Sequence, residues 1–315
     1  MHELVNTRHN LQIDPHLHIW GWEIGVYLFL GGLVAGMMII SGFFIFTGRT
    51  KNTKCSCFLI PIIALIAISL GMLSLFLDLE HKLYVWRMYL TFQWTSPMSW
   101  GAWILLLVYP VLIVNVLLKL PEELYGNFPH LRKISEYLNS SHSILQTIGM
   151  ISMIIGASLG MYTGVLLSAL GARPLWNSSM LWILFLTSGL SSAAAFIHLV
   201  AREEEERRML AKADNSFLIF EFVVIMLLLV GFLTSDQVHI EAVKLLLSGE
   251  YSAIFWVFVV SLGIVIPLII QLMAVNNKIR HTVIAPIMVM LGGLILRFVI
   301  VSAGQASHWS GQVFR

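Results

Sequence analysis

Eight long apolar segments run through this 315-residue chain and leave little of it outside them. A helix needs about 20 predominantly apolar residues to cross the hydrocarbon core of a membrane. The candidate spans cover residues 22–46, 58–79, 98–118, 143–168, 178–201, 215–235, 252–274 and 282–304. The sequence therefore predicts an all-α polytopic membrane protein. We expect one integral membrane domain over residues 1–315, with three spans in 1–142, five in 143–315 and no soluble domain.

Basic residues are divided unevenly between the two ends of the spans. With eight spans both termini lie on one side, here called side A, and the other side is side B. Side B connections carry twelve of the 19 basic residues: Arg49, Lys51, Lys54, Lys119, Arg132, Lys133, Arg202, Arg207, Arg208, Lys212, Lys278 and Arg280. Side A carries six: Arg8, Lys82, Arg87, Arg173, Lys244 and Arg315. The enrichment predicts that side B is cytoplasmic. The charged run REEEERR at 202–208 is then expected to be a solvated loop.

All tryptophans fall at the side A ends of the predicted spans. They are Trp20, Trp22, Trp86, Trp94, Trp100, Trp103, Trp176, Trp182, Trp256 and Trp309. Aromatic belts usually mark both membrane interfaces, so an uneven belt is one interpretation. The other is an aromatic-lined ligand site, a docking surface for a partner, or both, because aromatic residues are enriched at each.

Five ionisable residues lie within the apolar segments: Glu23, Asp78, His198, Glu221 and Arg297. A charge at a helix centre costs roughly 2.5–3.5 kcal/mol on insertion scales, so such groups should face one another or water. Depth along the spans places Glu23, Asp78 and Arg297 in one layer nearer side A, and His198 with Glu221 in a cytoplasm-facing pair. We expect Arg297 to pair with Glu23 or Asp78. The alternatives are that Glu23 is a helix N-terminal carboxylate among headgroups and that the Arg297 pair is only structural.

Two rows of glycine suit close packing between helices. The first span contains Gly21, Gly25, Gly32 and Gly36, and the fourth contains Gly156, Gly160 and Gly164. The side A ends of these spans also bring polar groups together. They are Tyr27, Tyr162 and Thr163, joined by Arg173 and Trp176 of the following loop. A polar pocket at side A is the expected result.

Several kinds of cofactor site are disfavoured by the residues present. A two-haem subunit would need four buried histidines, and only His198 lies well inside a span. Cys55 and Cys57 are the only cysteines, too few for an iron–sulfur cluster. The spacing of His16 and His18 is a weak metal signal without a third ligand, so no metal site is expected. The net charge of +2 gives no indication of a nucleic-acid partner.

Five segments, in order along the sequence, resemble the NrfD/PsrC family, the membrane subunits of polysulfide reductase-like complexes. They are GWEIGVYLFLGGLVAG at 21–36, SPMSWGAWIL at 96–105, GASLGMYTGVLLSALGARPLW at 156–176, LFLTSGLSSAAA at 184–195 and GGLILRFVIVSAGQ at 292–305. The resemblance implies two four-helix bundles and a non-haem subunit that carries no haem or iron–sulfur cluster, rather than a complete enzyme.

The same resemblance implies electron exchange between a membrane quinone, either menaquinone or ubiquinone, and an iron–sulfur partner subunit. That partner often connects to a molybdopterin subunit or a multihaem cytochrome c, in the cytoplasmic membrane of a bacterium or archaeon. Both termini and the partner would then lie on the periplasmic side, and proton translocation could accompany the reaction.

Candidate residues follow from the pocket and the resemblance together. For the quinone we expect Glu23, Tyr27, Asp78, Tyr162, Arg173, Trp176 and Arg297. For a proton path we expect Glu23, Asp78, His198 and Glu221. For partner docking we expect His18, Trp20, Trp86, Trp94 and Trp309. A secondary transporter that uses the buried charges is the main alternative, and a purely structural anchor is a third.

Overall fold

The computed structural model describes residues 20–48, 59–118, 129–171, 173–201, 203–276 and 282–307. This part of the protein is helical, without β-strands, and eight of its helical segments are long and apolar enough to cross a membrane. In sequence order they are α1 (Trp22–Phe46), α2 (Leu59–Asp78), α4 (Pro97–Leu118), α7 (His142–Ser168), α8 (Leu181–Val200), α9 (Glu204–Leu233), η4 with α11 (Ile254–Val275) and α12 (Ile284–Ala306). The predicted all-α membrane fold is confirmed.

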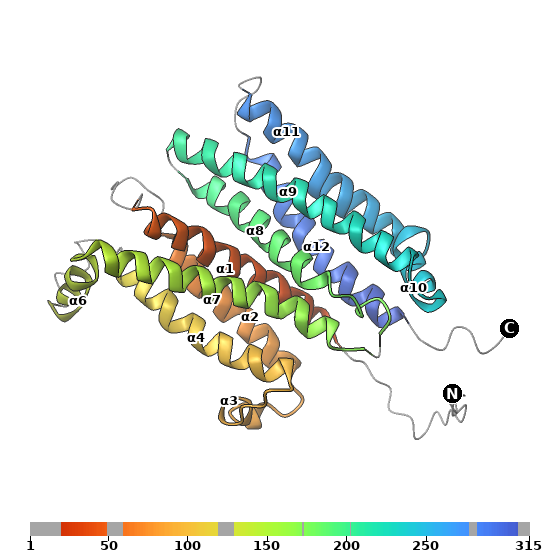
Figure 1. Cartoon of the computed structure of the whole chain (residues 1–315), viewed down its shortest axis with the longest axis horizontal. Coiled ribbons are helices and arrows are strands. Elements are labelled where there is room, and N and C mark those ends of the chain that lie inside the picture. Colours follow the sequence, from red (N-terminus) through yellow and green to blue (C-terminus); the bar gives the residue numbers. More distant parts are fainter. Residues whose placement is uncertain are drawn as a thin grey trace.

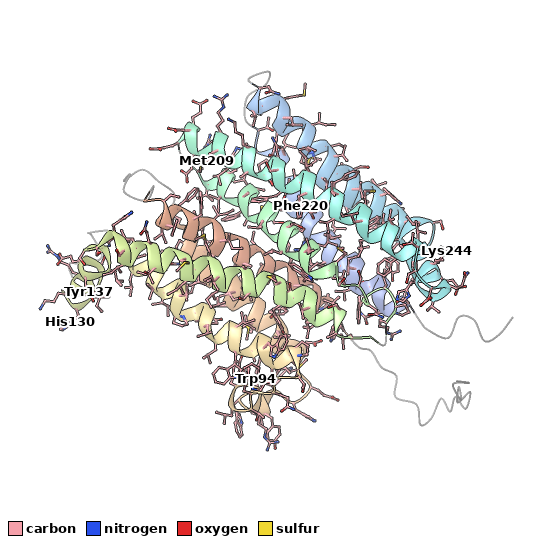
Figure 2. The ribbon with its side chains drawn as sticks, in the orientation of Figure 1. Trp94, His130, Tyr137, Met209, Phe220 and Lys244 are labelled. Carbon is pink, nitrogen blue, oxygen red and sulfur yellow. The ribbon has the colours of Figure 1, made fainter. Side chains whose placement is uncertain are left out.

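Short helices occupy the connections between the spans (Figure 1). On side A, η3 (Lys82–Tyr84) and α3 (Arg87–Leu90) follow α2, and α10 (Gln237–Leu247) follows α9. On side B, the amphipathic helix α6 (Pro129–Asn139) precedes α7. Figure 2 shows Trp94 projecting beyond the side A end of α4, and His130 and Tyr137 projecting from α6 at the opposite end.

The sixth span begins earlier than predicted. Glu204, Glu205 and Glu206 form the first turn of α9, so the prediction of a solvated loop over 202–208 is wrong from residue 204 onward. Carboxylates are favourable in a first turn because the backbone N–H groups there carry partial positive charge. Arg207 donates from Nε to the backbone oxygen of Ala201, 2.7 Å away, which ties α9 to the end of α8.

The seventh span changes its winding part-way across. Ile254–Val265 is a π-helix, η4, and Ile266–Val275 continues as the α-helix α11. The Ser261 hydroxyl accordingly donates to the backbone oxygen of Trp256, five residues earlier, at 2.8 Å. Gly263 lies directly against Gly292 of α12, so this wider helix still packs closely on its neighbour.

Helix α1 lies among α2, α7, α8 and α12 and contacts all four. Its predicted glycine row explains two of these contacts: Gly25 faces the ring of Phe298, Gly32 faces the side chain of Arg297, and Gly36 lies on the backbone of Gly189. Glycines allow such close approach because they carry no Cβ. The prediction of close packing is confirmed for these three positions, whereas Gly21 is covered by the side chain of Glu23.

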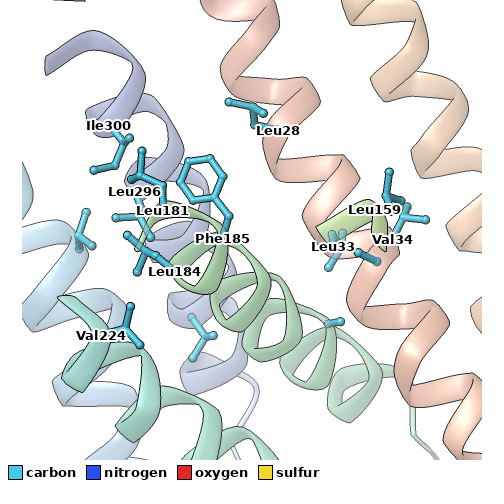
Figure 3. Close-up of a cluster of buried hydrophobic side chains, with 14 of the residues drawn as sticks. Leu28, Leu33, Val34, Leu159, Leu181, Leu184, Phe185, Val224, Leu296 and Ile300 are labelled. Atoms are coloured by element: carbon cyan, nitrogen blue, oxygen red, sulfur yellow. The ribbon is translucent and has the colours of Figure 1, made fainter. Parts of the chain in front are cut away.

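The contacts link α1, α2, α4 and α7 in the first half of the sequence, and α8, α9, α11 with η4, and α12 in the second. A continuous apolar core joins the halves, because α1 and α7 also pack against α8. Figure 3 shows part of this core, with side chains of α1 and α7 near those of α8, α9 and α12. Division into two separate four-helix bundles remains a prediction.

Candidate functional site

Two buried tyrosines lie together toward side A, in the first half of the protein. Tyr27 of α1 and Tyr162 of α7 are buried and close enough to interact through their side chains. Gly101 of α4 lies against the Tyr162 ring, where any Cβ would overlap it, and Gly71 of α2 touches the ring of Tyr27. The pair therefore sits where α1, α2, α4 and α7 meet.

The Tyr27 hydroxyl is buried beside the Tyr162 side chain, and it makes no hydrogen bond of normal geometry among the described residues. Leaving a hydroxyl buried without a partner costs free energy, so such groups are uncommon outside functional sites. A phenol hydroxyl can both donate and accept a hydrogen bond. The Tyr27 hydroxyl therefore has unused hydrogen-bonding capacity.

An aromatic connection, residues 79–96, covers the same end of the helices. Tyr89 of α3 interacts with both buried tyrosines and with Tyr109 of α4. Partial burial and the nearby Tyr109 hydroxyl raise the pKa of Tyr89 above its ordinary value. Other side chains of this connection are exposed, including Leu83, Trp86 and Trp94.

Glu23 lies one helical turn before Tyr27 on the same face of α1. Its backbone oxygen accepts a hydrogen bond from the Ser74 hydroxyl of α2 at 2.9 Å, and its side chain is partly buried. Asp78 ends α2 and is exposed. Both carboxyls therefore lie near the side A surface, as their position in the sequence predicted.

Arg297 lies in a different place from the one predicted. Its guanidinium is buried between helices: Nη1 donates to the Ser188 hydroxyl and to the backbone oxygen of Gly293, and Nη2 donates to the backbone oxygen of Phe185 at 2.9 Å. The carboxyl that interacts with it is Glu221 of α9. The predicted pairing of Arg297 with Glu23 or Asp78 is wrong, because Arg297 faces α8 and the glycine side of α1.

Glu221 is likewise not paired with His198. It lies beside Ser188 and Arg297, whereas His198 is buried in the last turn of α8. Ten residues separate Ser188 from His198 along α8, about 15 Å of helix. The prediction of a cytoplasm-facing Glu221–His198 pair is therefore wrong.

A further buried carboxyl, Asp214 of α9, did not enter the sequence prediction. It accepts hydrogen bonds from the Ser191 hydroxyl and from Nε2 of Gln271, both at 2.7 Å. The predicted sixth span began at residue 215 and so excluded it. A signal was present, because Asp214 and Glu221 are seven residues apart and lie on one helical face.

The predicted loop residues Arg173 and Trp176 hold the α7–α8 connection against the end of α12. Arg173 donates from Nη1 to the backbone oxygen of Ser307 at 3.1 Å, and the Trp176 indole N–H donates to the backbone oxygen of Ile300 at 2.8 Å. Trp20 stacks on Trp176 with ring centroids 5.0 Å apart. His18 and Trp309 lie outside the described residues.

A separate apolar groove of about 510 Å³ opens between α4, α6 and α7. Its lining includes Pro110, Leu138 and Ile151 and is almost wholly apolar. The groove does not include either buried tyrosine. In the described part of the protein, no group of three or more His, Cys, Asp or Glu side chains is placed to hold a metal ion.

The family model described as "Polysulphide reductase, NrfD" matches residues 9–307. The protein belongs to the NrfD family. It is 30% identical over 302 residues to a polysulfide reductase component of Wolinella succinogenes, covering 91% of this sequence and 94% of that one. "Protein NrfD" of Escherichia coli is 29% identical over 307 residues, which cover 91% of this sequence and 95% of that one.

A more distant relative in the family is a selenate reductase component of Mesobacillus selenatarsenatis, 21% identical over 323 residues, covering 93% of this sequence and 75% of that one. Two of these relatives are thus named as parts of reductases with different substrates. Together with the eight apolar helices, the match identifies a multi-pass membrane protein of a family of reductase membrane subunits.

Proposed function

We propose that this NrfD-family protein exchanges electrons between a membrane quinone and an iron–sulfur partner subunit that docks on side A. The observation that carries the proposal is the pair of buried tyrosines, Tyr27 and Tyr162, whose side chains interact across α1 and α7 while the Tyr27 hydroxyl makes no hydrogen bond of normal geometry among the described residues. The protein supplies the quinone site, and its partners supply the redox centres and the terminal substrate.

The residues present fit a quinone head group. Each of its two carbonyl oxygens accepts hydrogen bonds, and Tyr27 and Tyr162 offer hydroxyl donors from facing helices. Gly71 and Gly101 allow the backbones of α2 and α4 to pack directly against the rings of these tyrosines. The surrounding helices are apolar, which suits an isoprenoid tail of either menaquinone or ubiquinone.

Proton exchange requires acids and bases close to the tyrosines. Reduction of a quinone to a quinol takes up two electrons and two protons, and oxidation releases them. Glu23, one turn from Tyr27, would transfer protons at its carboxylate, and Asp78 at the exposed end of α2 would exchange them with water. Such transfers need donor and acceptor within hydrogen-bond reach or one water apart.

The 79–96 connection is our proposed docking surface for the iron–sulfur subunit. Trp86 and Trp94 are exposed there, and the Trp100 indole N–H fixes the loop by donating to the backbone oxygen of Trp94 at 2.9 Å. Exposed aromatic side chains are common at protein interfaces. A partner docked at this surface would bring its cluster close to Tyr89 and the tyrosine pair. Through that partner the complex would include a molybdopterin subunit or a multihaem cytochrome c.

The distribution of basic residues supports a cytoplasmic side B and a periplasmic side A. The complex would then lie in the cytoplasmic membrane of a bacterium or archaeon, with both termini outside. Arg173 and Trp176 would shape the side A surface through the α12 contacts described above.

The test is quinol-driven reduction of the partner's clusters in the purified complex. Tyr27→Phe and Tyr162→Phe each remove one hydroxyl, and we expect each to slow the reaction about tenfold, as the loss of one hydrogen bond worth about 1.4 kcal/mol predicts. Tyr137→Phe, on exposed α6, is the matched control and should leave the rate unchanged. Wild-type complex that shows no response to quinol would contradict the proposal.

One observation favours the transporter alternative: the seventh span is interrupted by a π-helix, and interrupted spans often line transport sites. A transporter would show solute or ion uptake in proteoliposomes without quinol and without the partner. We retain the quinone proposal because the tyrosine pair lies near the side A surface, whereas transporter sites lie at the midplane.

A further inference from the structure

The second half of the protein contains a buried charge cluster formed by Asp214, Glu221 and Arg297. These residues are 0%, 4% and 1% exposed, and Asp214 and Glu221 are the only buried carboxyl residues in the described part of the protein. They come from α9 and α12, with α8 and α11 packed against them. The tyrosine pocket does not use this cluster.

Asp214 sits in a site built by two other helices. Its Oδ1 accepts from the Ser191 hydroxyl of α8, and its Oδ2 accepts from the amide of Gln271 of α11, both at 2.7 Å. Gln271 is 2% exposed, and its own oxygen has no partner among the described residues. The carboxyl is therefore oriented from two sides in an enclosed polar site.

Ser188 connects the other two members of the cluster. Its hydroxyl accepts a hydrogen bond from Nη1 of Arg297 and also interacts with the carboxyl of Glu221. The Nε atom of Arg297 is buried and has no partner among the described residues. Seven residues, about 10.5 Å of helix, separate Glu221 from Asp214 on one face of α9.

Charge balance in the apolar interior fixes the protonation of this cluster. A net charge buried in a medium of low dielectric constant is strongly unfavourable. The Arg297 guanidinium does not lose its proton in proteins, so it balances one carboxylate. No other Lys, Arg, Asp or Glu side chain of the described residues is buried to the same degree. With two carboxyls and one guanidinium, the cluster is neutral when one carboxyl holds a proton.

We propose that Asp214 and Glu221 share a single exchangeable proton, with Arg297 setting the number at one. The proton leaves one carboxyl oxygen and reaches the other through the intervening hydroxyl groups of α8, each of which accepts one proton and releases another, so that no net charge is gained or lost. The hydroxyls of Ser191 and Ser188 on α8 contact Asp214 and Glu221 respectively. The Ser192 hydroxyl faces Gly293 of α12 and has no hydrogen-bond partner within the described ranges. The site is a proton-binding site within the membrane and is independent of the quinone pocket.

The position of the site connects it to side B. Asp214 lies nearer than Glu221 to the side B end of α9. His198 is buried near the side B end of α8, seven residues after Ser191 and on the same face of that helix. His198 is the remaining titratable side chain on this face of α8. Exchange of the shared proton with water is therefore expected through the side B half of the helices.

Infrared spectroscopy of the purified complex tests the proposal, because a protonated carboxyl has a C=O stretching band that an ionised carboxylate lacks. Difference spectra of wild type against Asp214→Asn and against Glu221→Gln should each show the loss of the same one-proton band, since the remaining carboxyl then ionises beside Arg297. In Arg297→Met no guanidinium balances a carboxylate, so both carboxyls should be protonated and the intensity of the C=O band should be about twice that of wild type. The amide variants keep the side-chain volume and should assemble.

Three results would overturn the proposal. In the first, the wild type has no band that either amide variant removes. In the second, Asp214→Asn removes the band and Glu221→Gln leaves it unchanged. The proton would then stay on Asp214 and would not be shared with Glu221. In the third, Ser191→Ala, which deletes one hydrogen bond to Asp214, leaves the band frequency unchanged. The last variant removes only one oxygen atom, so it gives an answer even if a charge variant fails to assemble.

Discussion

The tyrosine pair, Tyr27 with Tyr162, and the charge cluster show two ways of placing polar groups in a membrane protein. The tyrosine pair consists of uncharged hydroxyls near side A, and the Tyr27 hydroxyl makes no hydrogen bond of normal geometry among the described residues. The partly buried Glu23 and the exposed Asp78 lie toward the same side. The cluster contains charged groups deeper in the second half, most of whose polar atoms are hydrogen bonded. An unpartnered hydroxyl suits a ligand that comes and goes. A hydrogen-bonded set of charges suits a group that stays in place and holds a proton.

Removing the central charge should have the largest effect. Arg297→Met leaves Glu221 without its counter-charge and removes the hydrogen bond that Ser188 accepts. Loss of one member of a buried charge pair typically destabilises by about 3–5 kcal/mol. We expect a markedly lower melting temperature in detergent, partly restored by adding Glu221→Gln. If Arg297→Met melts like wild type, the cluster is not a set of coupled charges.

Filling the space beside Tyr162 should have the next largest effect. Gly101→Ala places a methyl group inside the volume of the Tyr162 ring. Overpacking of this kind costs about 1–3 kcal/mol, and the displaced hydroxyl should also slow quinol-driven electron transfer. Gly231→Ala in α9 is the matched control, because none of the described residues lies within 4 Å of the added atom. Equal rates of quinol-driven electron transfer in the two variants would show that the Tyr162 region takes no part in the reaction.

Breaking one hydrogen bond in the cluster should have a smaller effect than removing a charge. Ser191→Ala deletes the hydroxyl that donates to Asp214. The expected loss is about 1–3 kcal/mol of stability, with quinol-driven electron transfer unchanged because the pocket lies in the other half. Slowed electron transfer with unchanged stability would instead place Ser191 in the electron-transfer site.

The smallest effect concerns Tyr89, at the mouth of the pocket. Burial and the nearby Tyr109 raise the pKa of Tyr89 in the folded protein. As pH rises above about 10, the ordinary pKa of tyrosine, the unfolded protein loses this proton first, so the folded state loses stability. The melting temperature of wild type should therefore fall more steeply than that of Tyr89→Phe as pH rises through about 10. Parallel slopes would show that Tyr89 is effectively solvated.

The sequence predicted the spans because their apolar character is continuous, and it predicted the close contacts of Gly25, Gly32 and Gly36 because glycine spacing identifies a helix face. It did not predict the partner of Arg297. Depth along a span places a residue in a layer, but which helices surround it depends on helix order and rotation. Arg297 therefore matched Glu23 and Asp78 in approximate depth while facing Glu221 instead.

Boundaries and short helices were the other features that the sequence did not reveal. Asp214 was missed because the polar residues before it suggested that α9 began later, although acidic residues suit a helix start. The π-helix over Ile254–Val265 leaves no pattern in a segment where nearly every side chain is apolar. The tyrosine pair was predicted only in part, because Gly101 and Tyr89 come from segments whose approach to Tyr162 has no signature in the sequence.

The most direct test of the central claim is to locate the quinone by photo-crosslinking. The purified complex would be illuminated with a photoreactive quinone analogue and the labelled peptides identified by mass spectrometry. The account predicts labelling of segments that contain Tyr27, Tyr89 or Tyr162, abolished by excess unlabelled quinone. Labelling that excess unlabelled quinone prevents, but that is confined to α9, α11 and α12 or to the groove at Pro110 and Ile151, would contradict the account.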